Sequence, residues 1–295
     1  MPRWLERAIG RFREFAYKDV GERPRIGLAL GGGFARGIAH LGVLRVLEQS
    51  SIPIDCIAGT SAGAMLGISY ASGQPIEEIA RQAGATRFRD FGQWKLSWMG
   101  LATNTRMDGY LRRYLGVTTF DDLKIPLAIA ATDLETGEAF YFTEGPLGIA
   151  LRASCAYPGM FCPVECKGRL LVDGFLAAAV PVHAARKLGA DVVVGVFLQG
   201  DGGQKPTSVV DVVGRAFSIL QRKADREWRK EADVIIEPKV QQFAWDDFEK
   251  TPLLVAAGEE AALAALPEIQ AAIEKARNKK TALHFLPHVS HERKN

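Results

Sequence analysis

A serine between two glycines is the first candidate for chemistry in this chain. The stretch GTSAG, residues 59–63, follows the apolar run IDCIA and precedes the apolar stretch AMLGISYAS. This G-x-S-x-G pattern between a predicted strand and a predicted helix is typical of a nucleophile elbow, which presents its serine hydroxyl to a substrate. Gly59 and Gly63 would leave room for the sharp turn around Ser61. A serine that only caps the following helix fits the same pattern.

A second glycine turn, LGGGFARG at residues 30–37, also lies between a predicted strand and a predicted helix. It is neither a dinucleotide fingerprint, because Phe34 stands where the second glycine belongs, nor a P-loop, because G-K-[ST] is absent. Exposed amides on such a loop can stabilise an oxyanion beside a nucleophile. Arg36, inside the turn, could hold the loop in place or face an anionic head group; a solvent-exposed arginine at a helix start is the structural alternative.

A serine nucleophile needs a base, and Asp173 is the best candidate. It ends the strand-like stretch LLVD and is followed by Gly174, at the kind of strand end where the sites of α/β proteins collect. A simple Asp-Gly turn is the alternative. The chain has five histidines, but none has an obvious third partner, so a Ser-His-Asp triad is not supported. A Ser61–Asp173 pair is the simplest arrangement.

The elements that must position these residues alternate between strand and helix patterns, which indicates a parallel sheet covered by helices. The run DVVVGVFL, residues 191–198, is expected to be a buried parallel strand. Residues 87–109 are rich in aromatic side chains without a clear period, and we expect loops and a short helix there. A last helix over residues 253–280 is expected to be interrupted at Pro267. No repeat or linker divides the chain, so one α/β domain with a helical flank is predicted.

Composition and charge narrow the classes of function. The chain has 295 residues, enough for a substantial core, and its net charge of +3 is too small to favour nucleic-acid binding. The cysteines lack C-x-x-C spacing and are expected to be small buried thiols rather than metal ligands or disulfides. A reducing, cytoplasmic location follows. The four are Cys56, Cys155, Cys162 and Cys166.

Residues 1–24 have the pattern of an amphipathic helix, with Trp4, Ile9 and Phe12 on an apolar face and arginines over much of the rest. They contain no secretory signal, and no apolar run approaches the roughly 20 residues that span a bilayer. Such a helix could dock on the body of the protein or lie on an anionic membrane surface. The second possibility would place the protein peripherally on the inner face of the membrane.

Five motifs occur in the order found in patatin-like phospholipases: GGGFARGIAHLGVL, GTSAG, TDLETGE, RASCAYPGMFCPV and VDG. They look most similar to the bacterial branch related to the catalytic domain of neuropathy target esterase. The likeness covers roughly residues 25–275. It implies a three-layer α/β/α fold with a mostly parallel central sheet. It divides the chain into an N-terminal amphipathic helix (1–24), a patatin-like hydrolase domain (25–275) and a C-terminal tail (276–295).

The resemblance also implies a serine lipid acyl hydrolase that needs no metal or cofactor and acts on phospholipids, lysophospholipids or other acyl esters. Ser61 would be the nucleophile that forms an acyl-enzyme, and Asp173 the base. The oxyanion amides would come from Gly31, Gly32, Gly33 and Phe34. The supporting positions would be Arg36, Gly37, Gly59, Gly63 and Gly174.

The chain departs from the family pattern beside both motifs. Phe34 occupies a position that is usually glycine, and Phe175 follows Gly174 where the family usually has glycine or alanine. The Asn-Pro often found before the matching Pro181 is also missing. Two other functions therefore stay open: a lipid-binding or regulatory protein with an impaired site, and a transacylase that transfers the acyl group to an acceptor other than water.

Overall fold

The computed structural model describes residues 23–95, 97–199, 209–224 and 226–284. Its centre is a sheet in the order β10-β9-β1-β2-β5-β8-β7, with β6 also paired to β5. Two short strands, β3 (Gln93–Trp94) and β4 (Ala102–Thr103), form a separate hairpin. The strands of the large sheet are β1 (Ile26–Leu30), β2 (Cys56–Thr60), β5 (Leu127–Asp133), β6 (Ala139–Phe142), β7 (Val164–Cys166), β8 (Arg169–Asp173), β9 (Val192–Val196) and β10 (Val234–Ile236).

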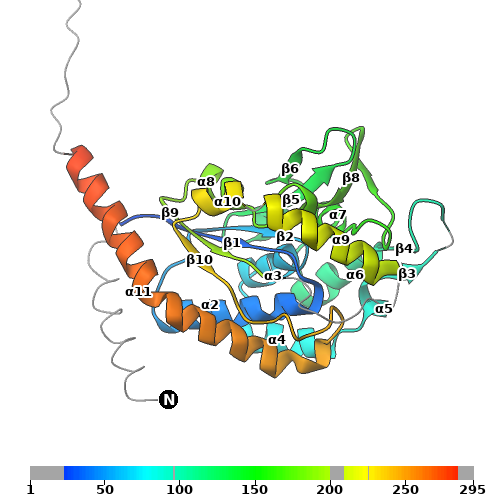
Figure 1. The fold of residues 1–295 in the computed structure, drawn as a ribbon, viewed down its shortest axis with the longest axis horizontal. Helices are drawn as coiled ribbons and strands as arrows, with labels where there is room; N and C mark the ends of the chain where they lie inside the picture. The colour runs from blue at the N-terminus through cyan, green and yellow to red at the C-terminus, as the bar shows by residue number, and fades with distance from the viewer. Residues whose placement is uncertain (1–22, 96, 200–208, 225, 285–295) are drawn as a thin grey trace, which may run out of the picture.

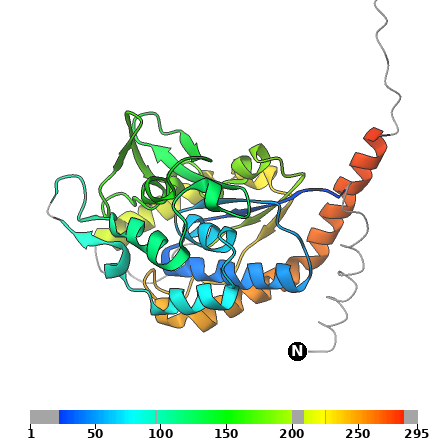
Figure 2. The ribbon, with the colours of Figure 1, turned by 180° about the vertical axis from the view of Figure 1, so that it is seen from behind.

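Helices cover both faces of this sheet (Figures 1 and 2). One layer contains α2 (Ala39–Gln49), α3 (Ala62–Ala71), α4 (Ile76–Ala85), α7 (Leu147–Ser154) and α11 (Thr251–His284), and the other α8 (Val182–Lys187) and α10 (Arg226–Glu231). Within the described residues, no helix combines the length and the apolar character that crossing a bilayer requires. The remaining helices are η1 (Phe34–Ile38), α5 (Phe88–Phe91), α6 (Arg106–Tyr110), η2 (Leu111–Leu115), η3 (Phe120–Asp122), η4 (Gly174–Leu176), α9 (Val209–Ala224) and η5 (Phe248–Lys250).

Side-chain size divides the two faces of the sheet. Successive residues of a strand point to opposite faces, and in β1 the large residues Leu28 and Leu30 pack on the layer that contains α2, α3 and α11. Ala29 points the other way and packs with small residues around α8. Strands β10, β9, β1, β2 and β5 run parallel, with both faces covered, as parallel sheets require. The expected three-layer α/β/α fold is confirmed.

Strand β5 is the element that brings distant segments together. β2 pairs with its first half in parallel, and β8 pairs with its end in the antiparallel sense. β6 overlaps both partners in register and must therefore occupy the opposite edge of β5. It follows that β2 and β8 approach each other along one edge, with Thr60 opposite Ala130 and Asp173 opposite Ala131.

Helices α2 and α11 touch backbone to backbone. A Cβ atom at Gly258 of α11 would overlap the carbonyl oxygen of Ala39, and one at Gly42 of α2 would overlap that of Val255. Only glycine fits where two helices approach so closely. This contact fixes α11 beneath the helix that follows the glycine-rich loop.

The last helix differs from the sequence-based expectation. α11 continues through Pro267, where an interruption was expected, and extends to His284. The proline ring is exposed, whereas the neighbouring Leu266 and Ile269 are buried against the core. Packing of this face offsets the one intrahelical hydrogen bond that proline removes. Residues 285–295 lie outside the described residues.

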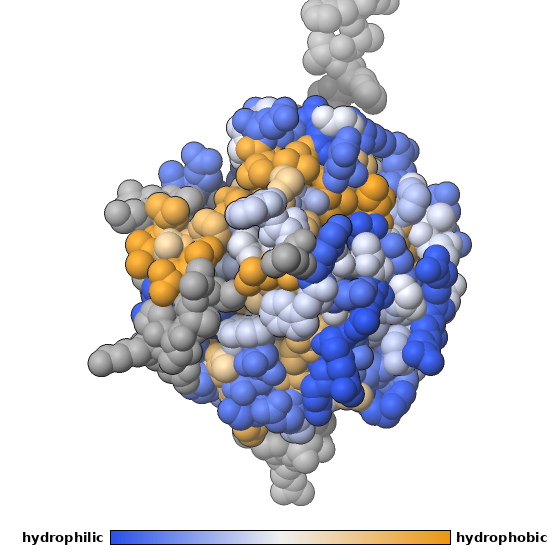
Figure 3. Space-filling view, turned by 90° about the vertical axis from the view of Figure 1, so that its right-hand side faces the viewer, coloured by the Kyte–Doolittle hydropathy of each residue, from blue (hydrophilic) through white to orange (hydrophobic). Residues whose placement is uncertain are grey.

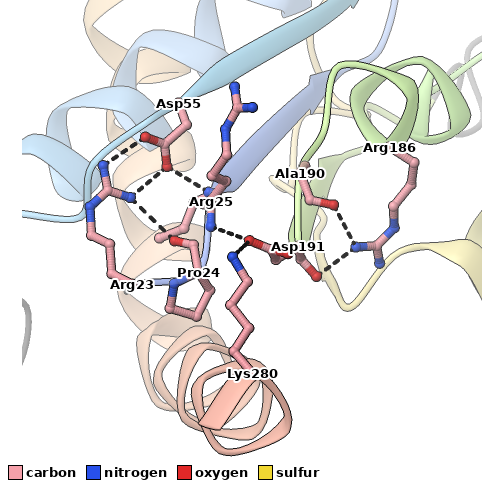
Figure 4. A network of polar contacts seen from close by, with 9 residues as sticks. Arg23, Pro24, Arg25, Asp55, Arg186, Ala190, Asp191 and Lys280 are labelled. Carbon is pink, nitrogen blue, oxygen red and sulfur yellow. Dashed lines mark hydrogen bonds and ion pairs between the residues drawn. The ribbon is translucent and has the colours of Figure 1, made fainter. Parts of the chain in front are cut away.

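A polar network holds the amino-terminal ends of the strands (Figure 4). Asp55 accepts two hydrogen bonds of 2.6 Å from the Arg23 guanidinium and one of 2.7 Å from the amide of Ile26. Burial opposes ionisation of this carboxyl, but these donors outweigh burial and hold the pKa of Asp55 below its usual value. Arg23, which the sequence analysis assigned to the N-terminal helix, is thus bound to the sheet.

A second aspartate in the same network ties the C-terminal helix to the sheet. Asp191 accepts a hydrogen bond of 2.6 Å from the amide of Arg25, and it forms an ion pair of 2.5 Å with Lys280 of α11. The start of β1 and the far part of α11 are therefore held together at one carboxylate. The rest of the expected amphipathic helix, residues 1–22, lies outside the described residues.

We expect Gly258→Ala to destabilise the protein by about 1–3 kcal/mol, the usual cost of overpacking a close contact. Gly109→Ala is the matched control, because a Cβ there meets nothing within 4 Å. The control should leave stability unchanged or raise it slightly, since alanine favours a helix. Urea unfolding of both variants measures the difference. Equal stability of the two variants would contradict the close α2–α11 contact.

Candidate active site

Ser61 stands on a strained turn between β2 and α3. Its φ and ψ angles are 53° and −118°, a backbone conformation that residues other than glycine seldom adopt. Strain of this kind persists only where the surroundings impose it, and it concentrates at functional sites. The surroundings here are tight, because a Cβ at Gly63 would overlap the carbonyl oxygen of Leu30. Gly59 and Gly37 are enclosed in the same way, by the start of α3 and by Ala62.

The shared edge of β5 brings Ser61 to Asp173. β2 ends at Thr60, so Ser61 is the next residue of the chain, and Asp173 ends β8 from the opposite direction. The Ser61 hydroxyl donates a hydrogen bond of 2.8 Å to Oδ2 of Asp173. The two residues are 112 positions apart in the sequence. This is the contact on which the sequence-based pairing depended.

The carboxyl group of Asp173 is almost completely buried, with 1% of the residue exposed. Burial raises its pKa to about 7, although hydrogen bonds from the amide of Phe175 and from Ser61 favour the ionised form. The Phe175 amide donates to Oδ1 at 3.0 Å, which leaves Oδ2 directed at the serine. A carboxylate of this basicity can accept a proton from a hydroxyl far better than an exposed aspartate can.

The backbone around Asp173 is fixed from two strands. The Thr132 hydroxyl donates to the Asp173 carbonyl at 2.8 Å, and the Thr60 hydroxyl donates to that of Ala178 at 2.7 Å. Gly174 has no room for a side chain, because a Cβ there would overlap the carbonyl oxygen of Ala130. The Asp-Gly sequence is therefore more than a turn signal: the glycine lets the chain cross β5 immediately after the aspartate.

The glycine-rich loop lies next to the serine, but its first amide is already engaged. A Cβ on Gly32 would stand 3.3 Å from the Cβ of Ser61. The amide of Gly31, however, donates to the carbonyl of Val196 at 3.0 Å and cannot also face an oxyanion. Gly31 thus supports the loop rather than supplying a donor. Within the described residues, no protein acceptor takes the amides of Gly32, Gly33 and Phe34.

His40 supports the same loop through a hydrogen bond to its backbone. Its Nε2 lies 2.8 Å from the Gly31 carbonyl, to which it can only donate. Complete burial lowers the pKa of His40 to about 4, despite the hydrogen bond to Gly31, so the ring is neutral near pH 7. His183 instead lies 3.5 Å from Glu231 on the surface. Neither of these histidines is bonded to Ser61, in keeping with a site that pairs serine with aspartate.

Two further residues at the serine escaped the sequence analysis. The Ser154 hydroxyl accepts the Ser61 amide at 2.8 Å and so holds the elbow from the end of α7. Ala62 begins α3, and the first amides of a helix have no partner within it. The amide after an elbow nucleophile is a typical oxyanion donor. The motif RASCAYPG drew attention to the Ser154 region, and the elbow pattern itself pointed to Ala62.

Phe34 occupies its unusual position at a conformational cost. Its φ angle is 50°, in the left-handed region that favours glycine. Its ring packs edge-to-face on Tyr157 and Trp245, with centroids 5.2 and 5.5 Å away. Aromatic contacts of this kind offset part of the strain. Arg36, in the same turn, is buried and its amide donates to the Gly33 carbonyl, which fits a bracing residue better than one that faces a head group.

An apolar pocket opens at Ser61. It extends between the loop and helices α3 and α4, in the layer of large side chains. The thiol of Cys155 is buried in its wall, which raises the pKa of this group and keeps it neutral. All four cysteines are free, and Cys162 is partly exposed. Residues that line the pocket include Phe34, Met65, Leu66, Ile79, Phe88 and Trp245.

Comparisons with known proteins agree on one family. An uncharacterized NTE family protein of Mycobacterium tuberculosis is 37% identical over 180 residues, which are 60% of this chain and 50% of that protein. The lysophospholipase nte1 of Emericella nidulans is 27% identical over 219 residues, 72% of this chain but 14% of that protein. The chain thus spans about half the length of the first relative and a small part of the second.

Solved structures support the same fold. The crystal structure of VipD from Legionella pneumophila has a TM-score of 0.50 and 14% identity, and the match covers 83% of this chain and 67% of that one. The sequence profile of the patatin-like phospholipase family matches residues 28–186, more than half of the chain, from β1 through the elbow to α8. The chain therefore belongs to the patatin-like phospholipase family.

Proposed function

We propose that this protein is a serine lipid acyl hydrolase in which Ser61 is the nucleophile and Asp173 the general base. The observation that carries the proposal is the 2.8 Å hydrogen bond from the Ser61 hydroxyl to the buried carboxyl, at the mouth of an apolar pocket. Membership of the patatin-like phospholipase family and the likeness to a lysophospholipase support a lipid ester as the substrate.

The first half of the proposed reaction is acyl transfer to the enzyme. Asp173 removes the Ser61 proton as Oγ attacks the ester carbonyl carbon. The negative charge that develops on the carbonyl oxygen faces the amides of Gly32, Gly33 and Ala62, with Phe34 as a further donor. Collapse of the tetrahedral intermediate breaks the bond to the alcohol, which leaves with the proton held by Asp173.

The second half releases the acid. Water attacks the acyl-enzyme carbonyl while Asp173 takes its proton, and collapse of the second tetrahedral intermediate returns that proton to Ser61 Oγ. The free carboxylic acid leaves, and the enzyme regains its starting state. No group beyond the protein and water is required to balance the steps. A transacylase would use the same acyl-enzyme with an alcohol or a lysolipid in place of water, and product analysis with an added acceptor separates the two.

The apolar wall of the pocket suits an acyl chain. Side chains from α3, α4 and the loop after β10 surround the space beyond Ser61, and a hydrocarbon chain gains free energy for each methylene removed from water. Contact of residues 1–24 with a membrane surface, and a cytoplasmic location, stay predictions, because residues 1–22 lie outside the described part of the chain.

Phe34 favours one rival function, a lipid-binding protein with an impaired site. Its strained backbone lies in the segment that supplies the proposed oxyanion amides. Against this rival, the Ser61–Asp173 bond and the Gly32 approach to the serine are both intact. Labelling of Ser61 by a fluorophosphonate distinguishes the two, because only an activated serine reacts rapidly.

Replacing Ser61 by alanine should abolish turnover of a short p-nitrophenyl ester, and Asp173→Asn should lower kcat by about 10²–10⁴-fold, the usual contribution of a general base. Ser69→Ala is the matched control. It removes a buried hydroxyl from the same helix α3, one that donates only to the Met65 carbonyl. The control should keep near-normal activity. Full activity of both dyad variants, in a preparation free of other esterases, would refute the proposed dyad.

The pH dependence follows from the raised pKa of Asp173. The base must be ionised, so kcat/KM should rise with pH through about 7, the folded-state pKa. The raised pKa also makes the stability of the protein depend on pH, but stability falls as the pH rises, whereas kcat/KM increases. Between the unfolded pKa of about 4 and the folded value, the native state holds a proton that the unfolded state has lost. As the pH rises through this range, the wild-type protein should therefore lose stability relative to Asp173→Asn. Thermal melts of both proteins at pH 5 and pH 8 measure this difference. A pH-independent difference would contradict burial of an ionisable base.

Two substitutions at Phe34 separate strain from contact. Phe34→Gly and Phe34→Ala both remove the ring, but only glycine adopts a φ of 50° without cost. Phe34→Gly should therefore be more stable than Phe34→Ala, by about 1 kcal/mol. Both variants widen the pocket and should raise the relative rate for bulky acyl esters over short ones. If the alanine variant proves as stable as the glycine variant, the loop does not hold the left-handed conformation.

A further inference from the structure

The β3–β4 hairpin presents large apolar side chains to solvent at one end of the molecule. Trp98 is fully exposed, at 106% of its reference area, and Trp94 is 70% exposed. Met99 and Leu101 beside them are 55% and 51% exposed. The hairpin extends from the body at the right of Figure 1, and Figure 3 faces this end, where apolar patches lie among hydrophilic side chains. A cluster of apolar groups of this kind on one protrusion marks an interaction site.

The base of the hairpin is firmly attached, so its exposure is not that of a frayed end. The amides of Leu101 and Ala102 both donate to the carbonyl of Met160, at 3.1 and 2.9 Å. Gly100 packs so closely on the backbone that a Cβ there would lie 2.6 Å from the amide nitrogen of Cys162. The protein therefore holds Trp98 and Met99 out into solvent from a fixed base.

The same hairpin is continuous with the acyl pocket. The ring of Trp94 lies 5.3 Å from that of Phe88, which stacks on Phe161 at 5.7 Å and meets Trp245 at 6.5 Å. Phe88, Phe161 and Trp245 all line the pocket that contains Ser61. An unbroken aromatic path thus runs from the exposed hairpin to the interior of the pocket.

The segment that contains the hairpin is positively charged. Residues 87–113 hold six basic and two acidic side chains, a net charge of +4, whereas the whole chain carries +3. The basic side chains are all exposed, and within the described residues none of them forms an ion pair. Lys95 belongs to the hairpin itself, and Arg106 of α6 donates to the carbonyl of Arg89 in α5, so both flanking helices contribute. The basic residues are Arg87, Arg89, Lys95, Arg106, Arg112 and Arg113.

We propose that the β3–β4 hairpin docks the protein on the surface of a lipid bilayer that carries anionic head groups. Tryptophan and methionine would enter the interfacial region, where tryptophan is favoured, while the arginines and Lys95 stay at the level of the phosphates. Charge complementarity selects an anionic surface. The proposal deepens the proposed function, because it names the surface from which an acyl ester passes along the aromatic path to Ser61.

Binding is tested in the full chain with Ser61→Ala as the parent, so that no hydrolysis occurs during the measurement. The variant adds Trp98→Ser and Met99→Ser, which remove the hairpin tip but leave Trp94 on Phe88. Its affinity for vesicles of phosphatidylcholine with a third of phosphatidylglycerol should fall by about tenfold or more, since it loses the burial of two apolar side chains. Leu134→Ser is the matched control, because Leu134 is also exposed (48%) but lies in the β5–β6 turn. The control should bind like the parent.

Two further measurements complete the test. The charge reversals Arg89→Glu and Lys95→Glu should weaken binding to the anionic vesicles at low salt and have little effect at high salt. In a background with Ser61 intact, the tip variant should still hydrolyse a soluble short ester within about twofold of wild type, because its substitutions lie outside the pocket. If the wild-type protein does not hydrolyse the soluble ester, the proposed function is refuted, whereas the result on vesicle binding still stands.

Three results would overturn the docking proposal. The tip variant could bind vesicles as tightly as the parent, or Leu134→Ser could lose as much affinity as the tip variant. The third is binding of the parent to a protein partner through the tip, with no binding to the anionic vesicles.

Discussion

The edge of strand β5 that β2 and β8 share is the constraint on which the rest of the structure depends. β2 and β8 come from opposite directions and meet at consecutive residues, Ala130 and Ala131. Their ends therefore direct Ser61 and Asp173 at each other with no intervening loop. The strained elbow, the glycine after the aspartate and the threonine hydroxyls all serve this junction. Because each is anchored in the sheet, the hydrogen bond between the two side chains is set by the fold rather than by flexible segments.

Burial at this junction acts on the carboxyl group of Asp173. It penalises the charged carboxylate, and so raises the pKa of Asp173 to about 7. His40 does not join this pair and instead holds the adjacent loop through the carbonyl of Gly31. In the proposed mechanism, one desolvated carboxyl would provide the basicity for which other serine hydrolases recruit a histidine with an aspartate behind it.

Local sequence patterns predicted much of this arrangement. The alternation of strands and helices indicated the layers, and the elbow and Asp-Gly patterns selected Ser61 and Asp173, although each pattern alone had a structural alternative. What the patterns could not contain is long-range pairing. The engagement of Gly31 by Val196, the support from Ser154 and the path from Trp94 to the pocket all depend on which strands and loops become neighbours. The interruption expected at Pro267 was wrong because burial of Leu266 and Ile269 outweighs a local helix signal.

The unequal side-chain sizes on the two faces of the sheet give its two layers different capacities for evolutionary change. Beneath α8, a Cβ at Gly27 would stand 2.6 Å from the Cβ of Ala190, so a larger residue does not fit at this position. The opposite layer is built from long side chains, and the pocket opens there between Met65, Leu66 and Ile79. Trimming or enlarging those residues reshapes the cavity while the junction of Ser61 and Asp173 keeps its support from the other side. Substrate range can therefore diversify in one layer while the second preserves the fold.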